Sequence, residues 1–178
     1  MNTKINALLA AIALAGVFSA SVDDASARER TRSRTATNVD GVRSAATSAS
    51  GSGVNGNYAR GRQWQADGRG NASGSRGATV NGVNGGSATG QSGFYRNADG
   101  SAGRQASASV NGPNGGTAST SSGVSRDANG NVVGNRSTTA TGRNGNSYDG
   151  STSVSNGTVI HTGTCTNAAG EVIPCRGN

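Results

Sequence analysis

The chain has 178 residues and a formal net charge of +7. Residues 28–178 contain no Leu, Met or Lys, and Val, Ile and Phe together make up 15 of these 151 residues. That share, about 10%, is far below the ~20% at which a chain normally sustains a packed core. The composition therefore excludes a conventional single-core domain, and it leaves two alternatives, which are substantial disorder and a thin β structure held by backbone pairing.

Residues 1–27 have the three parts of a secretory signal. Lys4 lies in a short polar start, an apolar stretch covers residues 7–20, and Ala25-Ser26-Ala27 supply small residues for cleavage. The apolar run is too short for a permanent membrane helix, and no second such run follows. We therefore expect a cleaved signal peptide and no transmembrane segment. The product would be secreted and extracellular or at the cell surface, or periplasmic in a bacterium.

Residues 28–52 are rich in Ala, Ser, Thr and Arg and show no apolar periodicity. This pattern predicts a flexible basic arm. Four arginines recur at every second residue: Arg28, Arg30, Arg32 and Arg34. In an extended chain they would share one face, which could dock on phosphate or carboxylate polymers. The alternative is a solvated basic stretch without a specific partner.

Residues 53–157 form a Gly/Asn/Ser/Thr-rich repeat region with a period of about 30. Residues 80–100 and 110–130 are identical at 12 of 21 positions, in the order VNGxNGG, SG and RxAxG. Each unit carries two turn sequences, NG or NGG and then ADG or ANG, in which Asn, Asp and Gly accept a positive φ. The spacing predicts an all-β repeat of short strands, folded as a meander or as a β-solenoid-like stack.

The last segment, residues 158–178, is predicted to be a terminal hairpin. Cys165 and Cys175 bracket its turn, and an even cysteine count in an exported chain indicates a disulfide. An intrachain bond would contribute about 2.5–3 kcal/mol in the chain-entropy model. Pairing between two chains is the alternative.

The sequence offers no catalytic, cofactor-binding or metal-binding residues. Gly51–Gly56 match GxGxxG, but no apolar run that would indicate a strand precedes them, and no helical pattern follows. His161 is the only histidine, so a triad with Asp149 would rest on residue types alone. Residues 97–100 and 127–131 lack the clustered carboxylates of calcium loops, and they are interpreted as turns. We therefore expect no enzymatic activity and no cofactor.

Aromatic residues interleaved with arginines form a candidate binding surface. Such pairs can stack on sugars or bases while holding anionic groups. The alternative is that these rings are the main apolar anchors of the repeat. The candidate anion-binding and stacking residues outside the arm are Arg60, Arg62, Trp64, Tyr95 and Arg96, with Arg69 and Arg76 beyond Trp64.

Two functional hypotheses follow. The first is a secreted, non-enzymatic structural or adhesive surface or matrix protein, built from β-rich repeats that stack within one chain or with other copies of it. The repeat resembles bacterial extracellular fibre and adhesin repeats of the functional-amyloid kind in composition and turn spacing, although it lacks the regular Gln/Asn pairs of curlin-type repeats. The second is an arginine-rich protein that binds acidic extracellular polymers, such as polysaccharide, lipopolysaccharide or nucleic acid.

Overall fold

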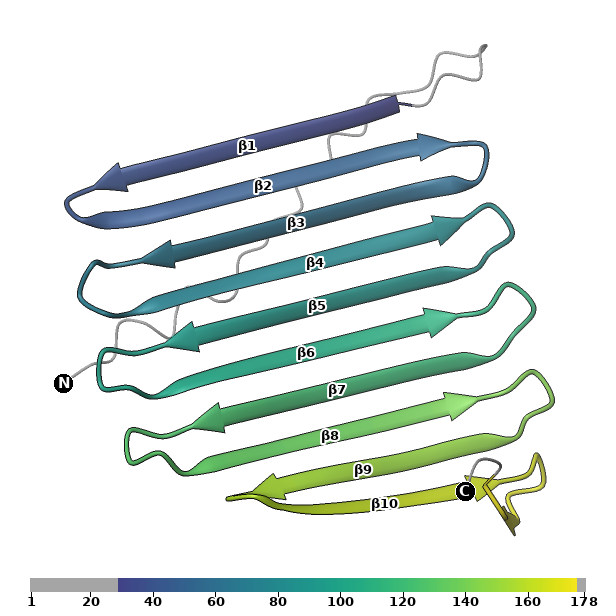
Figure 1. Ribbon diagram of the computed structural model, residues 1–178. Helices are drawn as coiled ribbons and strands as arrows, with labels where there is room; N and C mark the ends of the chain where they lie inside the picture. The colour runs from purple at the N-terminus through teal and green to yellow at the C-terminus, as the bar shows by residue number, and fades with distance from the viewer. Residues whose placement is uncertain (1–28, 176–178) are drawn as a thin grey trace.

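The chain forms one antiparallel sheet, which a computed structural model describes for residues 29–175 (Figure 1). Strand order follows chain order, so that each strand is hydrogen-bonded to the next. This arrangement confirms the predicted all-β meander. Within residues 29–175 there is no helix long and apolar enough to span a membrane. The strands are β1 (Glu29–Val39), β2 (Val42–Gly53), β3 (Gly56–Ala66), β4 (Ala72–Gly82), β5 (Ser87–Arg96), β6 (Ala102–Asn111), β7 (Thr117–Arg126), β8 (Val132–Thr141), β9 (Ser147–Ser155), β10 (Thr158–Thr166) and β11 (Val172–Ile173).

The 30-residue repeat is one hairpin together with its two turns. From β5 to β8 each strand has ten residues and each connection has five. A shift of 30 residues therefore moves the chain by two strands across the sheet. The matching copies at 80–100 and 110–130 lie in register, with β5 and β7 separated only by β6.

Most of the five-residue turns close by the same two backbone bonds. In the turn from Asn97 to Ser101, the first N–H donates to the fifth carbonyl at 2.8 Å, and Gly100 N–H donates to the Asn97 carbonyl at 3.0 Å. The fourth residue is glycine with a positive φ in every such turn, as at Gly100 with φ 86°. Glycine adopts this conformation without the steric cost that a side chain would bring.

Aspartate side chains lock several of these turns. Asp127 Oδ1 accepts hydrogen bonds from the backbone N–H groups of Asn129 and Asn131, both at 2.9 Å. Asp67 accepts the equivalent bonds in its own turn. Side-chain and backbone donors that stabilise the ionised form lower the pKa values of Asp67, Asp99 and Asp127, led by the side chains of Asn71, Ser101 and Asn131 respectively.

These turns predict a loss of stability in acid. A carboxylate whose folded pKa is depressed stabilises the fold above its ordinary value of 3.8, and this contribution disappears as pH falls through the folded pKa. Asn167 makes the same backbone bonds without titrating, since its Oδ1 accepts from Ala169 and Glu171 N–H.

The matched test is the triple variant Asp67→Asn/Asp99→Asn/Asp127→Asn. Its urea midpoint, followed by circular dichroism, should fall less steeply than the wild-type midpoint as the pH drops below 3.8. Equal steepness in the two proteins would contradict this role of the turns.

The predicted flexible arm at residues 28–52 is wrong for the residues that the structure describes. They lie in β1 and β2, which pair over their full length from Glu29↔Ser52 to Val39↔Val42. Asp40 and Gly41, with φ 51° and 78°, form the two-residue turn between them. Backbone pairing needs no apolar side chains, so the polar composition of this segment did not reveal it.

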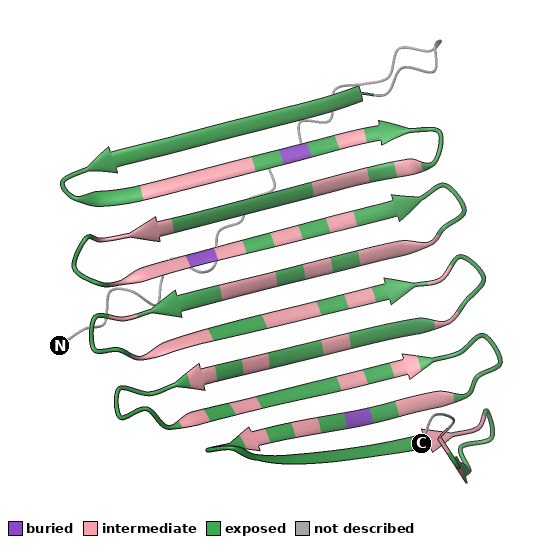
Figure 2. Cartoon of the chain, in the orientation of Figure 1, coloured by how far each residue is buried: buried purple, intermediate pink, exposed green. Residues whose placement is uncertain are grey.

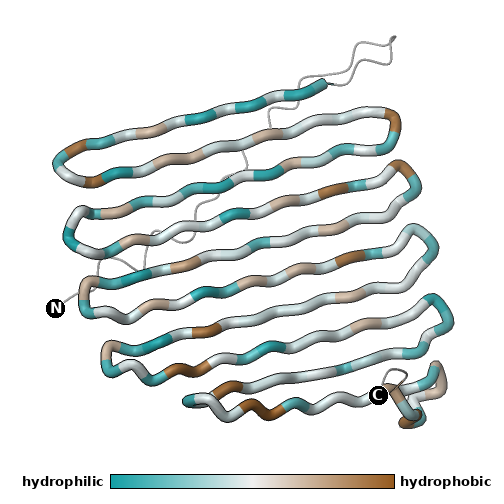
Figure 3. The backbone as a smooth tube through the Cα atoms, in the orientation of Figure 1, coloured by the Kyte–Doolittle hydropathy of each residue, from teal (hydrophilic) through white to brown (hydrophobic). Residues whose placement is uncertain are grey.

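The sheet has almost no interior. Ala49 is the only buried hydrophobic residue among residues 29–175, with 9% of its surface exposed. Ala49, Gly74 and Gly150 are the only buried residues among residues 29–175, and Figure 2 shows buried positions in purple as short, isolated stretches of the sheet. Apolar residues are scattered along the chain instead of gathering in one place (Figure 3). The fold is therefore a single layer held by its backbone ladders.

Candidate functional site

All arginines of the strands lie on one side of the sheet, which we call the arginine face. Directly opposite residues in an antiparallel pair point to the same side, so the registers from β1 to β10 assign every strand residue to a face. All these arginines are exposed. The eleven are Arg30, Arg32, Arg34, Arg43, Arg60, Arg62, Arg76, Arg96, Arg104, Arg126 and Arg136.

No acidic residue of the strands lies on this face. Glu29 and Asp149 are the two acidic strand residues, and the registers place both on the opposite side. Some arginines are direct neighbours, because Arg62 of β3 pairs with Arg76 of β4. Like charges in direct opposition repel each other. The arginine face therefore has an uncompensated positive field that attracts anions.

The opposite side is the hydroxyl face. It carries 30 serine and threonine residues of β1–β10, against six on the arginine face. Hydroxyl pairs bridge neighbouring strands, as in Thr89 with Ser109 and Ser119 with Thr139, both at 2.7 Å between oxygens. Such cross-strand pairs each contribute roughly 0.2–1 kcal/mol. This side has no arginine and only two acidic residues, Glu29 and Asp149, and most of its side chains are small and polar.

Aromatic rings lie over glycines of the neighbouring strand. A Cβ placed on Gly74 would meet Cε1 of Phe94 at 2.5 Å, and one on Gly51 would meet Cε1 of Tyr58 at 2.8 Å. Each ring therefore covers backbone, and it leaves its outer surface to solvent. Trp64 and Phe94 are 43% and 48% exposed. Trp64 and Phe94 therefore present exposed ring surface on the arginine face.

No protein-family model, curated protein or solved structure matches this chain. Its function therefore has to be inferred from the chemistry of the two faces.

The structure brings most of the predicted binding residues together. Arg30, Arg32, Arg34, Arg60, Arg62, Trp64 and Arg96 all lie on the arginine face. Tyr95 does not, because it alternates with Phe94 and lies on the hydroxyl face over Gly103. Arg28 is outside the described residues, and Arg69 lies in the turn between β3 and β4.

The sequence prediction missed Arg43, Arg104, Arg126 and Arg136. The sequence did contain a signal for their common face, because every arginine in the strands between residues 56 and 155 has an even residue number. Turns of five residues preserve that parity from strand to strand, as in the pair Ala66↔Ala72, whereas two-residue turns reverse it. The spacing of the arginines in the sequence therefore reveals their common face only after the length of each turn is known.

His161 and Asp149 lie on opposite faces and cannot form a hydrogen bond with each other. His161 pairs with Thr152 on the arginine face, and its Nδ1 lies 2.8 Å from Thr152 Oγ1. Across residues 29–175, no group of three or more His, Cys, Asp and Glu residues could hold a metal ion.

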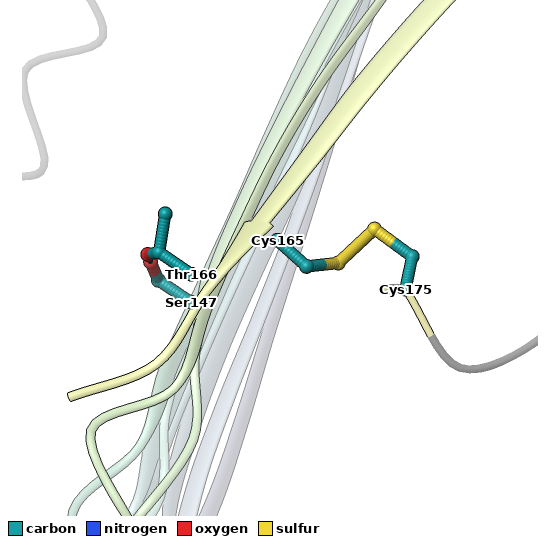
Figure 4. Close-up of a disulfide and its surroundings, with 4 residues drawn as sticks. All are labelled: Ser147, Cys165, Thr166 and Cys175. Carbon is teal, nitrogen blue, oxygen red and sulfur yellow. Dashed lines mark hydrogen bonds between the residues drawn. A yellow bond between two sulfur atoms is a disulfide. The ribbon is translucent and has the colours of Figure 1, made fainter. Parts of the chain in front are cut away.

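Cys165 and Cys175 form a disulfide within the chain, with 5.4 Å between their Cα atoms. Figure 4 views the sheet along its edge: the disulfide projects from one side, and the hydrogen bond between Ser147 and Thr166 lies on the other, at 2.6 Å. β11 pairs with β10 through only two residue pairs, Cys165↔Ile173 and Thr166↔Val172. The disulfide therefore secures the last strand to the sheet.

The double variant Cys165→Ser/Cys175→Ser should release β11 alone. The bond closes a short loop, whose constraint contributes about 2.5–3 kcal/mol in the entropy model. Hydrogen exchange should show faster exchange at Ile173, with unchanged protection at Ile160, which pairs with Ser153 of β9. Loss of protection at both residues would contradict a purely local role.

Proposed function

We propose that this chain is an exported, non-enzymatic structural or adhesive protein of a cell surface or matrix, and that it assembles with copies of itself. The observation that carries the proposal is the single layer with almost no buried residue. Domains normally consist of two or more layers that bury a common core. Residues 29–175 supply only one layer, so in this proposal the second layer comes from another copy of the chain.

The hydroxyl face suits contact with a second copy. Apart from Glu29 and Asp149, the side chains of this face are uncharged and mostly small, so two sheets can approach to the ~10 Å separation of stacked sheets. Side chains interdigitate in such interfaces. Two arginine faces would instead place eleven cations against eleven others. Stacking through the hydroxyl face leaves an arginine face outward on each side.

The edges of the sheet support lateral growth. All residues of β1 are exposed, and its outer edge has no strand partner among residues 29–175. At the far side, β11 covers only the end of β10 and leaves Thr158–Thr164 without an outer partner. Pairing two β1 strands would oppose arginines, whereas β10 has none. We expect β1 of one copy to pair with β10 of the next, which is a heterologous contact that continues as a filament.

The experiment is sedimentation and far-UV circular dichroism of the oxidised chain starting at Arg28, at physiological salt. We expect a β-type spectrum and large species that grow with concentration, with fibre diffraction near ~4.7 and ~10 Å. A chain that stays monomeric and coil-like at all concentrations would overturn the proposal.

A second candidate function is the binding of acidic extracellular polymers, which include polysaccharide, lipopolysaccharide and nucleic acid. The observation that favours it is the absence of acids on the arginine face, against eleven exposed arginines. Affinity for a polyanion should fall steeply as salt rises. Equal binding at low and high salt would exclude this function.

A further inference from the structure

A shallow hollow of about 640 Å³ crosses the arginine face. Small residues of β2, β4, β5 and β6 line it, including Ala49, Ala78, Gly90 and Ala106. Four arginines line the same hollow. Arg32 and Arg60 lie in the row of directly paired residues that contains Ala49 and Ala78, with Arg60 between these two alanines, and Arg62 and Arg76 lie in the next row. The hollow runs across the strands, so an elongated ligand would lie along the hydrogen-bonding direction of the sheet.

Two of these arginines, Arg62 and Arg76, are held in place by hydrogen bonds from their Nε atoms. Arg62 Nε donates to Thr47 Oγ1 at 3.1 Å, and Arg76 Nε donates to Ser92 Oγ at 2.9 Å. No hydrogen bond within residues 29–175 uses the terminal nitrogens of Arg62 or Arg76. Planar guanidinium groups present paired donors that match a carboxylate. An acid group between these two neighbours would also relieve their repulsion.

Exposed rings flank this hollow on the same face. Trp64 and Phe94 occupy the row beside Arg62 and Arg76, with Gly74 between the two rings. Phe94 lies over Gly74, so its outer surface faces solvent. Flat exposed rings accept the C–H faces of sugars as well as bases. The hollow therefore combines carboxylate-binding forks with stacking surfaces.

The spacing of the arginines distinguishes a carboxylated polysaccharide from a nucleic acid as the ligand of this hollow. One row contains Arg34, Arg62, Arg76 and Arg136, on β1, β3, β4 and β8. With strands ~4.8 Å apart, these four cations span roughly 34 Å. A stacked nucleic-acid strand carries one phosphate per ~3.4 Å, or about ten over that length. Along this one row, the cations are sparser than the phosphates of a nucleic acid, which matches a polymer whose acid groups are separated by uncharged rings and which lies along the row.

We propose that the arginine face binds a carboxylated polysaccharide, laid across the strands in this hollow, with its acid groups on Arg62 and Arg76 and its sugar rings on Trp64 and Phe94. The inference rests on the second candidate function and names its ligand. It does not depend on assembly, since stacking uses the other face.

The test measures binding to hyaluronan, which has one carboxylate per two sugars, and to uncharged dextran and a single-stranded oligo-dT, at matched low salt. We expect hyaluronan to bind more tightly than oligo-dT, and dextran not to bind. Arg62→Gln/Arg76→Gln should weaken hyaluronan binding about tenfold or more. Arg69→Gln/Arg143→Gln, which removes the same charge from turns, should change it less than about threefold.

A second pair of variants tests the stacking surface. Phe94→Leu should weaken hyaluronan binding several-fold, while Tyr95→Leu, the neighbouring residue on the hydroxyl face, should leave it unchanged. Circular dichroism of each variant establishes that the sheet has formed.

The possible outcomes distinguish failure of the polysaccharide site from failure of the second candidate function, which is the binding of acidic polymers in general. Tighter binding of oligo-dT, or equal losses in the two arginine pairs or in the two aromatic variants, would overturn the polysaccharide site and leave the second candidate function standing. Failure to bind either polyanion would overturn both.

Discussion

Gly56→Ala is expected to destabilise the sheet more than any other single glycine substitution. Gly56 has a φ of 125°, which side-chain-bearing residues rarely adopt. A methyl group there would also overlap the Asn81 carbonyl oxygen and come within 2.9 Å of Gly82 Cα. These are backbone atoms of β4, which cannot move without breaking the β3–β4 ladder. Urea denaturation should show a loss of about 3 kcal/mol or more.

Alanine substitutions at two other glycines separate the effect of backbone strain on stability from the effect of steric overlap. Gly130 has a φ of 89°, but a Cβ there would have no atom within 4 Å, so Gly130→Ala should cost about 1 kcal/mol. Gly61 lies in a strand without a positive φ, and its nearest neighbour, Thr47 O, would be 3.7 Å away. Gly61→Ala should be neutral or slightly stabilising. Equal losses for Gly56→Ala and Gly130→Ala would contradict the close approach of β3 and β4 at Gly56.

Ser121→Lys is expected to abolish assembly without unfolding the sheet. Ser121 lies near the middle of the hydroxyl face, where its hydroxyl is 3.1 Å from Ser137 Oγ. Stacking would bury one unpaired ammonium from each copy, at a cost of several kcal/mol. The concentration at which large species appear in sedimentation should therefore rise about 100-fold or more, since each 1.4 kcal/mol is a factor of ten.

Ser122→Lys is the matched control, because Ser122 is the adjacent residue and lies on the arginine face. Its lysine would remain in solvent, so assembly at physiological salt should change little. If the two variants assemble equally well, stacking does not use the hydroxyl face. If both stop assembling, net charge and not the choice of face controls the process.

Much of the fold was predictable, since turn chemistry and period are local properties. Asn-Gly and Asp-Gly pairs located the turns, and the 30-residue period matched two strands with two turns. The first hairpin was missed although Asp40-Gly41 is a hairpin turn sequence. The surrounding segment lacks the repeat and has few apolar residues, and pattern reasoning relies on apolar residues to find strands.

The two-faced character of the sheet was not predictable from spacing alone. Tyr95 and Arg96 adjoin in sequence and were predicted to share one binding surface, yet alternation places Tyr95 on the opposite face from Arg96. Conversely, Arg34 and Arg136 lie far apart in the chain but occupy one row of the same face. Register across the strands decides such placement, and it depends on the exact length of each turn.

The most direct test of the two-faced sheet uses spin labels on two adjacent residues of β6. Ser107 lies on the hydroxyl face, and Ala108 lies on the arginine face. Electron paramagnetic resonance of assemblies labelled through Ser107→Cys should show strong dipolar broadening between copies, because the stacked sheets are ~10 Å apart. Assemblies labelled through Ala108→Cys should show much weaker broadening. Equal broadening at the two positions, or stronger broadening at residue 108, would contradict the account.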